Sequence, residues 1–305
     1  MQTNKLIVIL GPTATGKTNL AANLALKISG EVISADSRQV YRGMDIGTGK
    51  DLADFEVKGV KIPYHLIDTI DAGAEYNVFE YQKDFLKAYE TVLKNNNTPI
   101  LCGGSGLYID AVVKGYRFLE VPEDTELRTE LEQKSIEELN NILSNYKTIH
   151  NTTDSIYKKR IIRAIEVAKF QTENEALIRD FPKIDHVIFG IDFDRDIIKK
   201  RITERLKHRL EHEGMIDEVK TLIANGVDPE KLKFYGLEYK LITQHLQDEL
   251  SYNDMFQKLN SAIHQFAKRQ MTWFRKMEKD GFNINWIDGN LPLEEKINFI
   301  LKTID

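Results

Sequence analysis

The chain has 305 residues, of which 42% are hydrophobic, so it is long enough for one large or two smaller domains and is not wholly disordered. Its 42 Lys and Arg against 47 Asp and Glu give a net charge of -5, which excludes a polybasic nucleic-acid binder but not a local basic groove. Cys102 is the single cysteine, which excludes an intrachain disulfide and a cysteine-based zinc site. No apolar stretch reaches the roughly 20 residues of a membrane helix. We therefore expect a soluble, cytoplasmic protein without membrane contact.

The first third of the chain alternates between two patterns. Short apolar runs predict buried parallel strands at 5–10, 31–35, 64–67 and 99–102. Apolar residues at helical spacing predict helices at 19–28 and 79–93. This alternation is typical of an α/β fold with a parallel sheet, in which ligands bind at the carboxyl ends of the strands.

From about residue 122 the pattern becomes mainly helical. Charged segments without strand signals occupy 124–145 and 154–170, a strand is predicted at 186–192, and further helices follow at 194–211, 215–225, 237–247 and 253–279, before a last strand at 282–287. We predict an α/β core, a parallel sheet flanked by helices, formed by residues 1–115 and 185–305. A helical insertion domain at 116–184 interrupts this core.

A phosphate-binding loop is predicted between the first strand and the first helix. The pattern G-x-x-x-x-G-K-[ST] is matched at every fixed position by Gly11, Pro12, Thr13, Ala14, Thr15, Gly16, Lys17 and Thr18. In such a loop, backbone N–H groups surround a phosphate, the lysine contacts the terminal phosphates and the hydroxyl binds Mg²⁺. A tight turn with packing glycines is disfavoured, because the flanking strand and helix are also present. We therefore predict that the α/β core is P-loop NTPase-like.

Asp36 follows the second predicted strand, next to this loop. A carboxylate there can support a metal ion, cap a helix or act as a base. The residues alone leave these three roles open.

Four further segments carry a resemblance to a known family. Residues 36–48 (DSRQVYRGMDIGT) closely resemble the signature of the tRNA dimethylallyltransferases, the isopentenyl-tRNA transferases of bacterial type. Residues 103–108 (GGSGLY) resemble that family's GGTGLY turn, residues 160–167 (RIIRAIEV) its R-x-x-R-A-L-E-V helix, and residues 267–275 (AKRQMTWFR) its A-K-R-Q-x-T-W-x-R block. The matches follow the family's order from about 11 to 275.

Two local departures from the family pattern stand out. The family usually continues GTAKP, whereas this chain has Gly49, Lys50 and Asp51 after Thr48, which leaves the conformation of that loop open. The family's V-G-Y-R segment appears here as residues 235–238 (YGLE), so an expected arginine contact to tRNA is missing or is supplied by Lys233 or Lys240. The zinc finger of eukaryotic relatives is absent.

The resemblance implies transfer of a dimethylallyl group from dimethylallyl diphosphate to N6 of adenosine 37 in tRNA, after this nucleotide flips out of its stack. The phosphate loop then holds a diphosphate leaving group, with Mg²⁺ on Thr18. Catalytic roles fall on Asp36 as the base and on Arg205, Lys17 and Thr18 around the diphosphate. The residues implied to contact the tRNA nucleotide are Asp36, Ser37, Arg38, Gln39 and Ser105.

Basic residues elsewhere in the chain are candidates for contacts with the tRNA backbone. Lys159, Arg160 and Arg163 cluster on one predicted helix, and Arg128 is added from its position in the family. An ordinary charged helix is the alternative for this cluster, as a solvated basic face is for Arg201 and Arg205. Further candidates for such contacts are Lys268, Arg269, Arg275 and Lys276. We predict the neighbouring Phe266, Trp273 and Phe274 as core residues rather than as stacking platforms for bases.

Three other functions stay open on the residues alone. They are a nucleotide or small-molecule kinase, an adenylate isopentenyltransferase acting on free nucleotide, and a non-catalytic RNA-binding module. A kinase needs a short lid where this chain has about 70 inserted residues, and an intact phosphate loop beside Asp36 argues against a binding module. We expect a monomer.

Overall fold

The computed structural model describes residues 5–146, 157–174 and 180–304. The chain divides into two compact units, one formed by residues 1–114 and 183–305 and the other by residues 115–182. The second unit falls where the sequence predicts a helical insertion, although residues 147–156 and 175–179 of the predicted insertion lie outside the described ranges.

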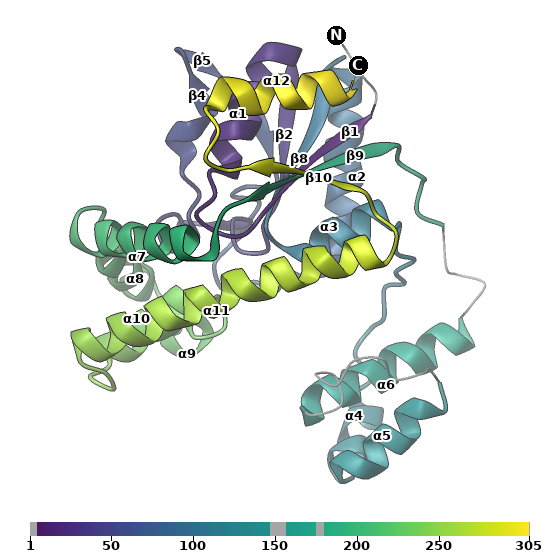
Figure 1. The fold of residues 1–305 in the computed structure, drawn as a ribbon. Coiled ribbons are helices and arrows are strands. Elements are labelled where there is room, and N and C mark those ends of the chain that lie inside the picture. Colours follow the sequence, from purple (N-terminus) through teal and green to yellow (C-terminus); the bar gives the residue numbers. More distant parts are fainter. Residues whose placement is uncertain (1–4, 147–156, 175–179, 305) are drawn as a thin grey trace. The chain divides into compact units, whose positions relative to one another are not determined.

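The first unit is built on a sheet of six parallel strands (Figure 1). The spatial order is β10 (Ile284–Asp288), β9 (His186–Asp192), β1 (Leu6–Leu10), β8 (Thr98–Gly103), β2 (Gly30–Ala35) and β6 (Tyr64–His65). Ile9 in β1 pairs with Cys102 in β8 and with Phe189 in β9. Every residue of β1 is buried, as expected for a central strand covered on both faces. The predicted α/β fold with a parallel sheet is confirmed.

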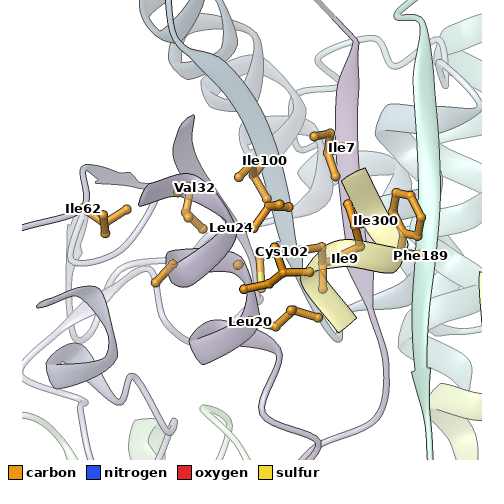
Figure 2. Packing of buried hydrophobic residues seen from close by; sticks show 14 of the residues in the cluster. Ile7, Ile9, Leu20, Leu24, Val32, Ile62, Ile100, Cys102, Phe189 and Ile300 are labelled. Carbon is orange, nitrogen blue, oxygen red and sulfur yellow. The ribbon is translucent and has the colours of Figure 1, made fainter. Parts of the chain in front are cut away.

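One face of the sheet is covered by α1 (Lys17–Ile28) and α12 (Leu293–Ile304), which lie side by side in Figure 1. Figure 2 shows Leu20 and Leu24 of α1 and Ile300 of α12 packed against Ile9 and Ile100 of the sheet. Because α1 begins directly after the phosphate loop, this packing fixes the loop at the carboxyl end of β1.

The opposite face carries α2 (Val78–Lys94) and α3 (Gly106–Val113). Tyr81 and Phe85 of α2 are fully buried, and the Tyr81 hydroxyl donates a hydrogen bond to the Ser34 carbonyl oxygen at 3.2 Å. The GGSGLY segment is expected to be a turn, but its last three residues, from Gly106 on, form the start of α3.

The helices that follow β9 form a second layer of the first unit. They are α7 (Arg195–Glu211), α8 (Met215–Ala224), α9 (Pro229–Leu232), α10 (Leu237–Leu246) and α11 (Tyr252–Lys279). Their apolar faces enclose one core, to which α7 contributes Ile198, Ile202 and Leu206. Short elements connect β2 to α2: β3 (Tyr41–Arg42), η1 (Leu52–Phe55), β4 (Glu56–Val57), β5 (Val60–Lys61) and β7 (Ile70–Asp71).

The second unit contains three described helices around a small core of its own. They are α4 (Thr125–Glu132), α5 (Ile136–Ser144) and α6 (Lys158–Glu173). Leu131, Leu139 and Ile161 are buried between them. No helix in the described part of the chain combines the length and apolar character needed to cross a bilayer.

Candidate active site

A cavity of about 450 Å³ opens in the first unit, at the carboxyl ends of the central strands. Such edges of parallel sheets are the usual place for ligands. Its wall contains Thr13 to Thr18 of the phosphate loop, Asp36 to Gln39 after β2, the turn at 47–51 and residues of α7, α10 and α11. The structure therefore brings the predicted loop and the predicted base to one cavity.

The phosphate loop is braced from a distant part of the chain. The Thr13 amide donates a hydrogen bond to Gln270 Oε1 at 2.9 Å, and Gln270 Nε2 donates to the Gly104 carbonyl oxygen at 2.9 Å. A side chain at Gly104 would displace the Gln270 amide and so disturb this brace. Gln270 lies in the AKRQ block of α11, but its contact with the loop was not foreseen, because the sequence contains no signal for a pairing across 257 residues.

Lys17 begins α1 and points back over the loop. Its Nζ donates a hydrogen bond to the Pro12 carbonyl oxygen at 2.7 Å. Burial and, to a lesser extent, the positive charge of Arg205 lower the pKa of Lys17 to about 8, although Asp36 and Asp51 oppose the shift. The ammonium group is thus held beside other charges in the wall of the cavity.

Asp36 lies at the end of β2, partly buried in the cavity wall. Its Oδ1 accepts a hydrogen bond from the Arg38 amide at 2.9 Å. Burial raises the pKa of Asp36 above its ordinary value, although the Arg38 amide and the charge of Lys17 counteract this. A carboxylate with a raised pKa takes up a proton more readily, which suits a general base.

The residues after Asp36 are tied to the neighbouring strand and turn. The Ser37 amide donates to Ser105 Oγ at 2.9 Å, and Gln39 Nε2 donates to the Gly49 carbonyl oxygen at 3.1 Å. Gln39 Oε1 also accepts from the Ser34 hydroxyl at 2.9 Å. Asp36, Ser37, Arg38, Gln39 and Ser105 therefore form one hydrogen-bonded wall of the cavity.

Two arginines of α7 border the phosphate loop. Arg201 Nε donates to the Ala14 carbonyl oxygen at 2.8 Å, and its guanidinium lies over the Phe193 ring. Arg205 Nη2 contacts Asp51 at 3.0 Å. The sequence pointed to Arg205, but it gave no role to Asp51 or to Arg209, which binds the same carboxylate. The departure from the family pattern at residues 49–51 was the one sequence feature that pointed to these contacts of Asp51.

Oxygen ligands suitable for a magnesium ion line the same cavity. The Thr18 hydroxyl, Asp36 and Asp54 are in its wall, and Mg²⁺ prefers hard oxygen donors. Within the described residues, no three His, Cys, Asp or Glu side chains form a metal-binding group. The donors therefore fit an ion that takes most of its remaining ligands from phosphate oxygens and water, as Mg²⁺ commonly does.

The four predicted tRNA-backbone residues lie in the second unit, where they differ in environment. Arg128 makes a two-pronged contact with the buried Glu166, with both distances 2.9 Å, and Arg163 contacts the same carboxylate. Burial alone would raise the pKa of Glu166, but Arg128, Arg163 and the Asp124 amide lower it to about 2. Both arginines therefore serve the structure of this unit.

Lys159 and Arg160 are exposed on α6, and the Arg160 guanidinium lies over the Tyr157 ring. This exposed pair retains the character of a phosphate-binding surface. The cluster predicted from sequence thus separates into two exposed cations and one cation committed to a buried glutamate.

The prediction of a buried Phe266 is wrong. Phe274 is fully buried and the Trp273 indole donates to Asp110, but Phe266 is 38% exposed and lines the cavity. The Arg269 guanidinium lies over the Phe266 ring at 6.0 Å. Phe234, also in the cavity wall, is 79% exposed. Flat, exposed rings at the rim of a phosphate-binding cavity are typical platforms for nucleobases.

Comparison with known proteins gives the family. The model of the family described as IPP transferase matches residues 39–277. A protein named tRNA dimethylallyltransferase 2 from Bacteroides fragilis is 56% identical over 295 residues, which cover 97% of this chain and 96% of that protein. A protein of the same name from Phocaeicola vulgatus is 53% identical, covering 100% of this chain and 99% of the relative. The chain belongs to the IPP transferase family.

Solved structures agree with this assignment. The full-length tRNA isopentenylpyrophosphate transferase from Bacillus halodurans matches with a TM-score of 0.72 and 32% identity, covering 99% of this chain and 96% of that chain. A eukaryotic dimethylallyltransferase, described as acting on tRNA, matches the fold with a TM-score of 0.75 at 22% identity, covering 94% of this chain and 74% of its own. For this IPP transferase family member, the kinase and binding-module alternatives are therefore not favoured.

Proposed function

We propose that this protein transfers a dimethylallyl group from dimethylallyl diphosphate to N6 of adenosine 37 in tRNA and releases diphosphate. The observation that carries the proposal is the shared cavity: a phosphate loop with Lys17 and a partly buried carboxylate, Asp36, line the same 450 Å³ space. A loop for a diphosphate and a base for an amine are the two groups that this transfer needs.

The phosphate loop stabilises the diphosphate leaving group. Breaking the carbon–oxygen bond of dimethylallyl diphosphate leaves negative charge on the departing diphosphate. The loop amides, Lys17 and Arg205 surround the space where that charge develops, and fixed charges of this kind are usually the largest catalytic contribution. A magnesium ion, held by Thr18 and the diphosphate oxygens, would supply further positive charge there.

The amine half falls to Asp36. The N6 nitrogen of adenine is a weak nucleophile because its lone pair is delocalised into the ring. As the new carbon–nitrogen bond forms, one N6 proton passes to the Asp36 carboxylate, so that no charge accumulates on the nitrogen. Ser37, Arg38 and Gln39, next to Asp36 in the wall, are positioned to contact the adenine.

The nucleic-acid partner is supported by the rim of the cavity. An adenine stacked in an anticodon loop reaches such a cavity after it flips outward, which leaves its neighbours in need of new stacking partners. Phe234 and Phe266 present exposed rings at that rim, and Lys159 and Arg160 offer exposed charge for phosphates in the second unit. We expect the enzyme to act as a monomer in the cytoplasm.

A single assay tests the proposal. The protein is incubated with Mg²⁺ and dimethylallyl diphosphate labelled in the dimethylallyl group, together with tRNA, with AMP or with ATP. Label in the tRNA, found in N6-(dimethylallyl)adenosine after digestion to nucleosides, supports the proposed function. Label in AMP or ATP alone indicates an adenylate isopentenyltransferase, and phosphate transfer from ATP indicates a kinase.

A further inference from the structure

The turn at 47–51 places a carboxylate between two arginines at the wall of the cavity. Asp51 uses separate oxygens for them: Oδ2 accepts from Arg205 Nη2 at 3.0 Å and Oδ1 accepts from Arg209 Nη2 at 2.8 Å. The arginines are four residues apart on α7 and so project from the same side of the helix. The Arg205 and Arg209 side chains are 30% and 9% exposed, whereas that of Asp51 is 44% exposed, so solvent reaches these contacts mainly from the carboxylate side.

The backbone of the turn is shaped to admit these arginines. Gly49 has φ of +70°, and a side chain there would collide with the Arg205 guanidinium and approach that of Arg209. Asp51 itself has a positive φ of 35°, which few residues other than glycine adopt. The buried Lys50 side chain anchors the turn, because its Nζ lies 2.6 Å from the Asp45 carboxylate and also contacts Asp68. The turn is therefore held in place independently of the arginines.

The Asp51 carboxylate offsets the repulsion between the positive charges that surround it. Without Asp51, two guanidinium groups would face each other across one helical turn, with Lys17 close enough for its pKa to respond to Arg205. Burial and the charge of Arg209 both lower the pKa of Arg205, and Asp51 opposes them. Glu213 lies 3.7 Å from Arg209 Nε, and the partly buried Glu238 also faces both arginines. Among these carboxylates, Asp51 contacts both guanidinium groups directly.

We propose that Asp51 is a positioning residue for the transfer reaction, which holds the Arg205 guanidinium at the phosphate loop and separates it from Arg209. The inference rests on the proposed function of Arg205 at the diphosphate. A fixed arginine contributes most where charge grows during the reaction, because no reorganisation is then needed. The Asp51 carboxylate also repels a bound diphosphate, so removal of its charge is not expected to weaken diphosphate binding.

The test compares Asp51 with an exposed carboxylate of α7 that lies outside the cavity wall. Asp51→Asn removes the charge that holds Arg205, whereas Glu204→Gln removes an equal charge from a side chain whose carboxylate lies 3.9 Å from Lys200 Nζ. Single-turnover transfer to tRNA and the Kd of inorganic diphosphate are measured for both. We expect Asp51→Asn to slow transfer about tenfold or more without raising the Kd, whereas Glu204→Gln changes each quantity by less than about twofold.

Combination with Arg205→Ala distinguishes positioning from other roles. If Asp51 acts through Arg205, Asp51→Asn has no further effect on the rate once Arg205 is alanine. Equal losses in both backgrounds overturn the proposal, as does a wild-type rate in Asp51→Asn. A lower melting temperature with a slower rate and a raised Kd, unrelieved by Asp51→Glu, also overturns it, because that is the pattern of a structural residue. If wild-type protein does not modify tRNA, the proposed function itself fails, whereas tRNA modification by wild type with equal losses in both backgrounds contradicts the role of Asp51 alone.

Discussion

Lys17 is a residue whose environment sets a limit on activity at high pH. Its pKa is lowered to about 8, first by burial and then by Arg205, so the ammonium group loses its proton as the pH rises through that value. Because diphosphate binding needs the charged form, we expect the Kd for dimethylallyl diphosphate to be constant near pH 7 and to rise above about pH 8, approaching tenfold per pH unit. Isothermal titration between pH 7 and 9.5 measures this dependence.

The matched variant is Lys17→Arg, whose guanidinium stays charged over the whole range. Its Kd for dimethylallyl diphosphate is expected to be higher than that of wild type at pH 7 but not to rise above pH 8. The same rise in Lys17→Arg would mean that another group titrates, and Lys17 would then not be the source.

Phe234 is 79% exposed in the wall of the cavity, an unusual position for an aromatic residue without a binding partner. If its ring stacks on a nucleobase, Phe234→Ala raises the KM for tRNA about tenfold and leaves the KM for dimethylallyl diphosphate unchanged. Phe234→Trp retains a flat ring and keeps wild-type behaviour, whereas Phe234→Leu keeps apolar bulk and behaves like alanine. If the KM for tRNA is the same as that of wild type in all three variants, the Phe234 ring does not contact the tRNA.

At the residue scale, the sequence located the groups that belong to motifs and missed those that depend on tertiary contact. Lys17, Asp36 and Gln39 lie in recognisable patterns, and they do meet in one cavity. Asp51 and Gln270 take part through partners more than 150 positions away, and neither pattern nor periodicity reports such pairings. Phe266 was misjudged, because helical spacing did not show that its side of α11 borders a cavity.

At the scale of elements, uninterrupted apolar runs predicted the central strands within one or two residues. β1 and β9 need apolar side chains on both faces, so their sequences are unambiguous. The strand predicted at 64–67 ends at His65, because Leu66 takes a positive φ of 61° that breaks the extended backbone. No helix was predicted at 293–304, although Ile297 and Ile300 give α12 an apolar face. The glycines before α3 favoured a turn and masked its start.

The contact between α4 and α6 makes Glu166 important to the second unit. Its carboxylate is 2% exposed and contacts Arg128 and Arg163, so Glu166→Gln removes the counter-charge of Arg163 and leaves Arg128 with Glu123 alone. We expect a loss of about 3 kcal/mol of local stability, detected as faster hydrogen exchange in α4 and α6 at pH 7. Glu137→Gln, at an exposed site on α5, is the control. Unchanged exchange in Glu166→Gln would show that this cluster does not stabilise the unit.

The direction of the pKa shift of Glu166 determines how its contribution to the stability of the second unit changes with pH. The pKa of Glu166 falls from 4.5 to about 2, so the folded state favours the ionised form. Its stabilising contribution is present above about pH 4.5 and is lost as the pH falls toward 2. Wild-type protein should therefore show exchange in α4 and α6 that accelerates on acidification relative to the intrinsic rate, a change that Glu166→Gln lacks.

At the scale of the whole molecule, a net charge of -5 means that contacts with tRNA must be local. Lys159 and Arg160 are exposed, whereas Arg163 is committed to Glu166, so the double variant Lys159→Ala/Arg160→Ala is the informative one. If both cations meet phosphates, log Kd for tRNA plotted against log salt loses about two units of slope, while the melting temperature is unchanged. The control is Lys94→Ala/Lys302→Ala, two exposed cations of α2 and α12. An equal slope in the α6 variant and wild type would place the tRNA elsewhere.

The central claim is that one cavity brings together a diphosphate-binding loop and a base for the adenine amine. Single-turnover transfer by Asp36→Asn, with tRNA and dimethylallyl diphosphate both saturating, tests it most directly. The amide keeps the size of the carboxylate but cannot take up the N6 proton, so the account predicts a rate lowered by about 10²–10⁴-fold. The Kd values for tRNA and for diphosphate should stay close to those of wild type. A near-normal transfer rate in Asp36→Asn would contradict the account.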